Sequence, residues 1–157
     1  MQRVLVVDDQ YQIRRMVRWA VETAGFEMLE ATNGETGLAM ALKLKPQLVL
    51  LDVMMPGRFD GLAVCRHIRS RPETEGTWVV LLSGNDTPQD RELGKQAGAN
   101  AYLTKPFKPA VLAGLIEKLL ASGPAPKSSQ AAAQLPDGGA MPVAPASSPA
   151  EPTGTSS

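Results

Sequence analysis

The chain has 157 residues, of which 43% are hydrophobic, and its 16 basic side chains balance 16 acidic ones. This length and apolar content suffice for the core of one ordinary domain, and a single cysteine excludes an internal disulfide framework. The balanced charge gives no reason to expect direct binding to nucleic acid or to an anionic membrane. The N-terminal apolar run is too short for a signal peptide or a membrane span, so we expect a cytoplasmic protein.

Five short apolar runs alternate along the chain with five amphipathic segments. The apolar runs have the length of strands, and most lack polar alternation, as expected for strands covered on both faces. They are residues 4–7, 26–31, 48–51, 78–82 and 101–103. The predicted helices are residues 11–24, 34–44, 61–70, 88–97 and 108–120. Five βα units predict an α/β fold with a doubly wound parallel sheet, whose ligand site lies at the carboxyl ends of the strands.

The composition changes after about residue 121. Residues 122–157 are mainly Ala, Pro, Ser and Gly, with few large apolar side chains. Such a segment cannot bury enough surface to offset its ordering entropy. The sequence therefore predicts a folded domain over residues 1–121 and a disordered tail or linker over residues 122–157.

Polar side chains follow the predicted strands at one edge of the sheet. Asp8 and Asp9 follow the first strand, Asp52 follows the third, Ser83 the fourth and Lys105 the fifth. If the first and third strands are neighbours, three carboxylates lie close together, and their repulsion favours a cation among them. Carboxylate oxygens are the ligands that Mg²⁺ prefers. A lysine and a hydroxyl opposite them suit the oxygens of a phosphoryl group on one carboxylate, and the small Gly84 lets the backbone approach it.

These residues resemble the receiver (CheY-like) domain of bacterial two-component response regulators over residues 2–121. The motifs that carry the resemblance are Val6-Val7-Asp8-Asp9, Asp52-Val53-Met54-Met55-Pro56-Gly57, Leu82-Ser83-Gly84 and Lys105-Pro106-Phe107. The resemblance implies a flavodoxin-like (βα)5 fold with strand order 2-1-3-4-5. It also implies a phosphorylation-activated signalling switch in a phosphorelay, not an enzyme beyond its own phosphorylation and dephosphorylation.

The resemblance also implies a role for each site residue. Asp52 would be the phosphoacceptor, and Lys105 would bridge it to the phosphoryl group. Asp9, Asp52 and the backbone carbonyl of Met54 would bind Mg²⁺, with Asp8 helping through water. The backbone at Met54 and Gly84 would contact the phosphoryl group, and the bond before Pro106 would be cis.

Ser83 and Tyr102 are the switch residues that the resemblance implies. The Ser83 hydroxyl would move toward the phosphoryl group while Tyr102 turns inward, which changes the face formed by the fourth helix, fifth strand and fifth helix. The expected partners are a sensor histidine kinase or histidine phosphotransfer protein and a downstream protein. The expected assembly state is a monomer or weak dimer.

Some features leave alternatives open. Arg58 and Phe59 both separate Gly57 from Asp60, one residue more than the family pattern has, so the course of this loop is open. Taken singly, Asp8-Asp9 could be a solvated pair at a helix start, and Ser83 an ordinary strand-end hydroxyl. The chain could also be the receiver part of a larger regulator or a phosphorylation-independent scaffold. A hydrolase is disfavoured because Met54 stands where an acid is usual, and His67 and Cys65 are assigned no role.

Overall fold

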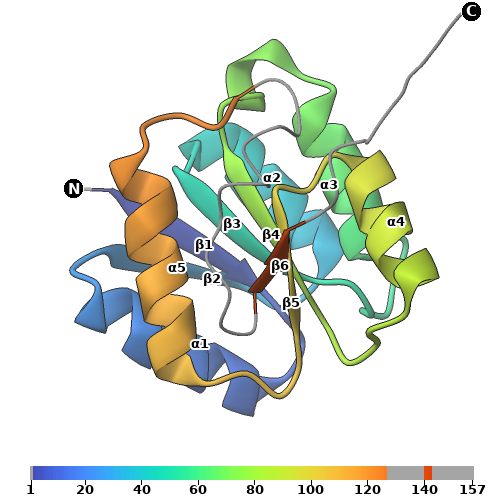
Figure 1. The fold of residues 1–157 in the computed structure, drawn as a ribbon. Helices are drawn as coiled ribbons and strands as arrows, with labels where there is room; N and C mark the ends of the chain where they lie inside the picture. The colour runs from blue at the N-terminus through green and yellow to red at the C-terminus, as the bar shows by residue number, and fades with distance from the viewer. Residues whose placement is uncertain (1, 127–139, 143–157) are drawn as a thin grey trace, which may run out of the picture.

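A mainly parallel sheet forms the centre of the structure, a computed structural model that describes residues 2–126 and 140–142 (Figure 1). Its parallel strands are β1 (Arg3–Val7), β2 (Glu27–Ala31), β3 (Leu48–Asp52), β4 (Trp78–Ser83) and β5 (Ala101–Thr104). They lie in the order β2-β1-β3-β4-β5, with parallel pairing throughout. This confirms the predicted fold and strand order.

Helices cover both faces of the sheet (Figure 1). They are α1 (Tyr11–Thr23), α2 (Gly34–Leu44), α3 (Gly61–Arg69), α4 (Pro88–Ala97) and α5 (Pro109–Ala121), with a short 3₁₀ turn, η1 (Pro72–Thr74). Helices α1 and α5 pack on one face, while α2 and α3 pack on the other with α4 beside α3. None of the helices among the described residues is long and apolar enough to cross a membrane.

The continuous apolar runs are explained by the two layers of helices. Along β3, Leu48 and Leu50 join the core beneath α1 and α5, whereas Val49 and Leu51 join the core beneath α2 and α3. Successive side chains of a strand point to opposite faces, so a strand covered on both sides is apolar at every position. All four of these side chains are fully buried.

Side-chain caps fix the starts of three helices. Asn33, Asp60 and Thr87 each accept a hydrogen bond from a backbone N–H in the first turn of α2, α3 and α4 respectively. Such caps satisfy N–H groups that have no partner within the helix. The predicted helix over residues 88–97 is therefore confirmed, with Thr87 as its N-cap and Gly98, at a φ of 95°, at its end.

The segment after α5 differs from its prediction in two places. Residues 122–126 stay against the domain, because the Trp78 indole N–H donates to the Gly123 carbonyl (2.8 Å) and the Ala125 N–H to the Gly76 carbonyl (2.8 Å). A sixth strand, β6 (Ala140–Pro142), pairs antiparallel with β5. The outer edge of β5 would otherwise expose unpaired backbone groups, which a short strand can satisfy. The rest of the predicted tail lies outside the described residues.

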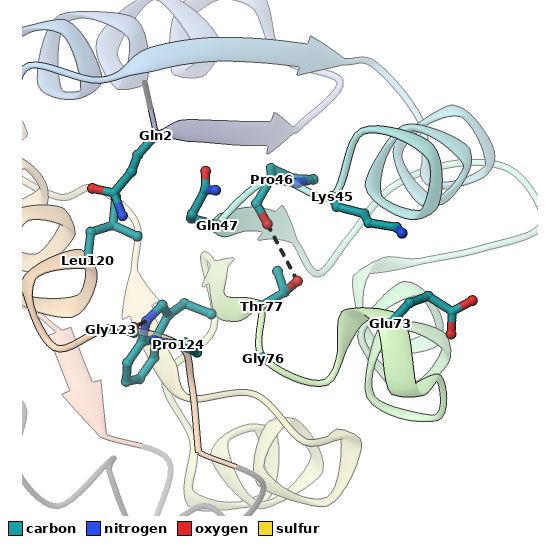
Figure 2. A pocket seen from close by; sticks show the side chains of 11 residues that line it. Gln2, Lys45, Pro46, Gln47, Glu73, Gly76, Thr77, Leu120, Gly123 and Pro124 are labelled. Carbon is teal, nitrogen blue, oxygen red and sulfur yellow. Dashed lines mark hydrogen bonds between the residues drawn. The ribbon is translucent and has the colours of Figure 1, made fainter.

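A pocket of about 260 Å³ lies where the strands begin, opposite to their carboxyl ends (Figure 2). Gln2, Gln47, Trp78 and Pro124 are among the residues that line it, and Thr77 Oγ1 lies 3.5 Å from the Pro46 carbonyl. Gly123 and Pro124, which follow α5, therefore form part of the wall of this pocket.

Candidate functional site

Three carboxylates meet at the carboxyl ends of β1 and β3. Asp8 and Asp9 follow β1, Asp52 is the last residue of β3, and one oxygen of each lies within 4.8 Å of the others. Asp8 and Asp52 are buried, whereas Asp9 is exposed. The direct pairing of β1 with β3 brings them together, as the predicted strand order requires. A buried acidic cluster of this kind needs a positive charge nearby.

Lys105 supplies positive charge to this cluster from the end of β5. Its Nζ lies 2.9 Å from Asp8 Oδ2 and 3.3 Å from Asp52 Oδ1. The ammonium group therefore bridges the two buried carboxylates across the sheet. A pocket of about 590 Å³ opens above them, lined by Asp9, Gln10, Ile13, Asp52, Met54, Gly84, Asn85, Lys105 and Pro106. The Asp52 carboxylate is therefore among the groups that line an open pocket.

Burial raises the pKa of Asp52 from 3.8 to about 6, and the negative charge of Asp8 adds to this effect. Lys105 acts in the opposite direction, through its charge and its hydrogen bond. The Met54 N–H, 3.3 Å from Asp52 Oδ1, also favours the ionised form. Asp52 is therefore a carboxylate at neutral pH, and a further cation in the cluster would favour that form more strongly.

Ser83 ends β4, the strand next to β3. Its hydroxyl oxygen accepts a hydrogen bond from the Asn85 N–H at 3.0 Å, and the residue is buried. Gly84, which follows, lines the pocket, and a Cβ there would meet no atom within 4 Å. The backbone of this loop is therefore open to a group bound above Asp52.

Tyr102 lies on β5 behind the pocket rather than in it. The ring is buried, and its hydroxyl donates to the Asn85 carbonyl at 2.9 Å. Gly94 of α4 makes room for the ring, because a Cβ at that position would lie 3.3 Å from Tyr102 Cδ2. The Tyr102 ring therefore packs in the core of the domain, next to Gly94 of α4.

The residues of the acidic cluster fit a hard divalent cation. They offer one oxygen each from Asp8, Asp9 and Asp52, within a cluster of the size a single ion can occupy. Mg²⁺ is usually held by one or two carboxylates, a phosphate and several waters. Asp9 is exposed and the pocket is open, which leaves space for waters around an ion. Asp8 already pairs with Lys105, so its carboxylate is less available to an ion than those of Asp9 and Asp52.

Gln10 belongs to the site, although the sequence did not single it out. Its backbone N–H donates to Asp8 Oδ1 at 2.8 Å, and its side-chain Oε1 accepts from Lys105 Nζ at 3.3 Å. The only signal in the sequence is its position directly after Asp8-Asp9. Polar residues just before a helix usually cap it, which would have turned this side chain away from Lys105.

The loop with the extra residue packs against α2 and α3. The Phe59 ring meets the His67 ring edge-on at a centroid distance of 5.2 Å, and Arg58 Nε lies 3.9 Å from Glu35 Oε2. Gly34 is required here, because a Cβ on it would lie 2.2 Å from the Phe59 carbonyl oxygen. His67 thus serves as a packing partner. Cys65 is a core residue, and burial raises its thiol pKa to about 12.

The peptide bond between Lys105 and Pro106 is cis, as expected from the family resemblance. The five parallel strands, the acidic cluster and the bridging lysine define the class of protein. It is a flavodoxin-like domain with a charged site at the carboxyl ends of its strands.

Comparisons with known proteins agree with this class. Residues 4–117 match the response regulator receiver domain family. The chain is 38% identical over 118 residues to the transcriptional regulatory protein ResD of Bacillus subtilis, covering 75% of this chain and 48% of ResD. It is 35% identical over 117 residues to the phosphate regulon transcriptional regulatory protein PhoB of Pseudomonas aeruginosa, covering 74% of this chain and 51% of PhoB.

Solved structures show the same fold. The chemotaxis response regulator CheY4 of Vibrio cholerae superposes with a TM-score of 0.70 at 32% identity, covering 76% of this chain and 98% of CheY4. The chain belongs to the response regulator receiver domain family, whose general function is phosphorylation signalling in two-component systems. It spans about half the length of the curated relatives ResD and PhoB.

Proposed function

We propose that this receiver domain is switched by transfer of a phosphoryl group from a sensor histidine kinase or histidine phosphotransfer protein to Asp52. The observation that carries the proposal is the position of the Asp52 carboxylate, which lies among Asp8, Asp9 and Lys105 beneath an open pocket. A carboxylate nucleophile, a cation and an ammonium group are the parts that phosphoryl transfer needs.

In the proposed transfer, a carboxylate oxygen of Asp52 forms a bond to phosphorus while the bond from phosphorus to the donor nitrogen breaks. The donor imidazole keeps the bonding electron pair and is neutral once it holds a single proton. Lys105 neutralises charge on the transferred group, and the Ser83 hydroxyl and the backbone at Met54 and Gly84 provide further contacts. The carboxylates of Asp8, Asp9 and Asp52 and the Met54 carbonyl would hold Mg²⁺, which neutralises charge on the phosphoryl oxygens. Hydrolysis of the acyl phosphate resets the switch without further enzymatic output.

The Ser83–Asn85–Tyr102 hydrogen bonds support a route from the site to the surface. When the Ser83 hydroxyl turns to a phosphoryl oxygen, the Asn85 N–H loses its acceptor. The Asn85 carbonyl accepts a hydrogen bond from the Tyr102 hydroxyl. A shift of the loop at Asn85 therefore changes the hydrogen bond of Tyr102 on β5. We propose that a downstream protein reads this change on the face formed by α4, β5 and α5, without direct contact with nucleic acid by this domain.

Intact mass spectrometry tests the proposal. The full chain is incubated with Mg²⁺ and acetyl phosphate, with Asp52→Ala as a parallel sample. We expect one phosphoryl group on the wild type and none on the variant. No adduct on the wild type would contradict the proposal and favour a phosphorylation-independent scaffold. An adduct that persists in Asp52→Ala would also contradict it, because the phosphoryl group would then be on another residue.

A larger natural protein is a second proposal, favoured by one specific observation. The transcriptional regulators ResD and PhoB are about twice as long as the region they share with this chain. We propose that this chain is the receiver part of such a regulator, working in the cytoplasm where phosphodonors are made. An immunoblot of the native protein, which reads its full mass, tests this. A native protein of 16.7 kDa would contradict it.

A further inference from the structure

The ammonium group of Lys105 has three acceptors. Nζ lies 2.9 Å from Asp8 Oδ2, 3.3 Å from Asp52 Oδ1 and 3.3 Å from Gln10 Oε1. An ammonium group carries three N–H donors, and the Lys105 side chain is only 15% exposed. Asp8 and Gln10 accept hydrogen bonds from this ammonium group and Asp52 forms an ion pair with it, so a phosphoryl oxygen that binds Lys105 competes with these three partners.

Gln10 reaches Lys105 because of the way α1 begins. The residue precedes Tyr11 as the N-cap, with φ −92° and ψ 119°, yet its side chain makes no capping hydrogen bond. Its backbone N–H is anchored on Asp8 Oδ1 at 2.8 Å. The backbone N–H of Gln10 is thus bonded to Asp8, which is itself a partner of Lys105. The Gln10 side chain accepts a hydrogen bond from Lys105 instead of capping the free N–H groups of α1.

The three acceptors differ in how readily they can leave. Asp8 and Asp52 are buried and charged, so their bonds to an ammonium group are charge-assisted on both sides. Gln10 is exposed, and its amide oxygen is neutral. Its carbonyl can exchange Lys105 for water at small cost, whereas a buried carboxylate that lost its partner would be left uncompensated. Gln10 is therefore the acceptor that releases Lys105 most readily.

We infer that Gln10 is a positioning residue that occupies the Lys105 N–H needed by the incoming phosphoryl group, and so slows phosphorylation of Asp52. This inference rests on the proposed function of Asp52. Gln10, the residue after Asp8-Asp9, competes with the phosphoryl group for one N–H of Lys105. The side chain at position 10 then tunes how readily the domain is phosphorylated.

Two substitutions at this position should act in opposite directions. Gln10→Ala removes the competing acceptor, so we expect faster phosphorylation and tighter binding of beryllofluoride, a non-reacting analogue of the phosphoryl group. Gln10→Glu keeps the size and strengthens the hold on Lys105, so we expect slower phosphorylation and weaker beryllofluoride binding. Each change should be about threefold to tenfold, as expected for one exposed hydrogen bond to a charged group.

The experiment measures the rate constant for phosphorylation by acetyl phosphate with Mg²⁺, and the beryllofluoride affinity, on the full chain. Gln12→Ala and Gln12→Glu are the matched controls, since Gln12 is exposed in the first turn of α1 and carries the same change of charge. We expect the Gln12 variants to match the wild type. A role that is merely structural would weaken beryllofluoride binding in both Gln10 variants.

Opposite shifts of the two Gln10 variants support the inference. Equal rates, a slower Gln10→Ala, or the same direction in both variants overturns it while leaving the proposed function intact, provided the wild type is phosphorylated on Asp52. Wild-type protein that accepts neither a phosphoryl group nor beryllofluoride overturns both. The two failures are therefore distinct.

Discussion

The hydroxyl of Tyr102 donates a hydrogen bond to the backbone carbonyl of Asn85, 2.9 Å away. The N–H of the same residue donates to Ser83 Oγ at 3.0 Å. One peptide segment thus connects the end of β4 with the ring on β5. A movement of Ser83 changes a partner of Asn85 directly, without rearrangement of the strands.

Removal of the Tyr102 hydroxyl should lower stability. In Tyr102→Phe the buried ring keeps its packing against Gly94, but the Asn85 carbonyl loses its side-chain donor. We expect the free energy of unfolding in urea to fall by about 0.5–1.5 kcal/mol. Tyr11→Phe is the control, because that side chain is 62% exposed and should change little. Equal stabilities of the two variants would mean that the Tyr102–Asn85 bond contributes nothing measurable.

Asp52 should make the metal-free domain less stable as the pH rises. Its pKa is about 6 in the folded domain, above its ordinary value of 3.8, so the folded state holds the proton more tightly between these values. The contribution of this group to stability is therefore largest below about pH 4 and is lost as pH rises through about 6, by about 1–3 kcal/mol.

Urea unfolding of the wild type and of Asp52→Asn in EDTA, from pH 4 to pH 8, measures this effect. The variant cannot ionise at this position, so its advantage over the wild type should grow with pH and level off above about pH 7. Carboxyl groups far from Asp52 titrate in both proteins and cancel in the difference. A difference that does not vary with pH would contradict the expected titration of Asp52.

Gly61 should be intolerant of substitution because α3 begins against the backbone of β3. A Cβ at this position would lie 2.3 Å from the Asp52 carbonyl oxygen, so either α3 or β3 must shift. We expect Gly61→Ala to lower the free energy of unfolding by about 2–4 kcal/mol. Gly114→Ala is the control, since Gly114 is exposed within α5 with no atom near its Cβ position.

The control substitution should raise stability by about 0.5–1 kcal/mol, because alanine favours a helix over glycine. Thermal and urea denaturation of both variants measure these changes. Similar effects at the two positions would show that α3 can move away from Asp52 without cost. Asp52 would then be held less rigidly than its burial implies.

Apolar runs that end in charged residues made most of this structure predictable. Asp8 and Asp52 could be placed together because β1 and β3 are buried on both faces and parallel strands bring their carboxyl ends to one edge. Lys105 followed from the same reasoning applied to β5. The cluster therefore depends on topology alone, which hydrophobic periodicity specifies well.

Other contacts depend on rotamers or single backbone groups, which no periodicity encodes. The contact of Gln10 with Lys105 arises from a side chain that does not cap its helix, and the pairing of Asn85 with Ser83 and Tyr102 is made by its backbone. For residues 122–126 and for β6, the structure also differs from the disordered tail that composition predicts. A few hydrogen bonds hold these residues in place, although they have little apolar surface. The roles of Ser83 and Tyr102 in switching remain predictions.

The anchorage of residues 122–126 has a mechanical consequence. Gly123 and Ala125 are bonded to Trp78 and Gly76, at the start of β4, and the other end of that strand is Ser83. A load on the backbone of residues 122–126 is therefore shared between α5 and the start of β4, at the end of the sheet away from Asp52. Strand β4 thus connects this anchored segment at one end with Ser83 at the other, beside the end of β3.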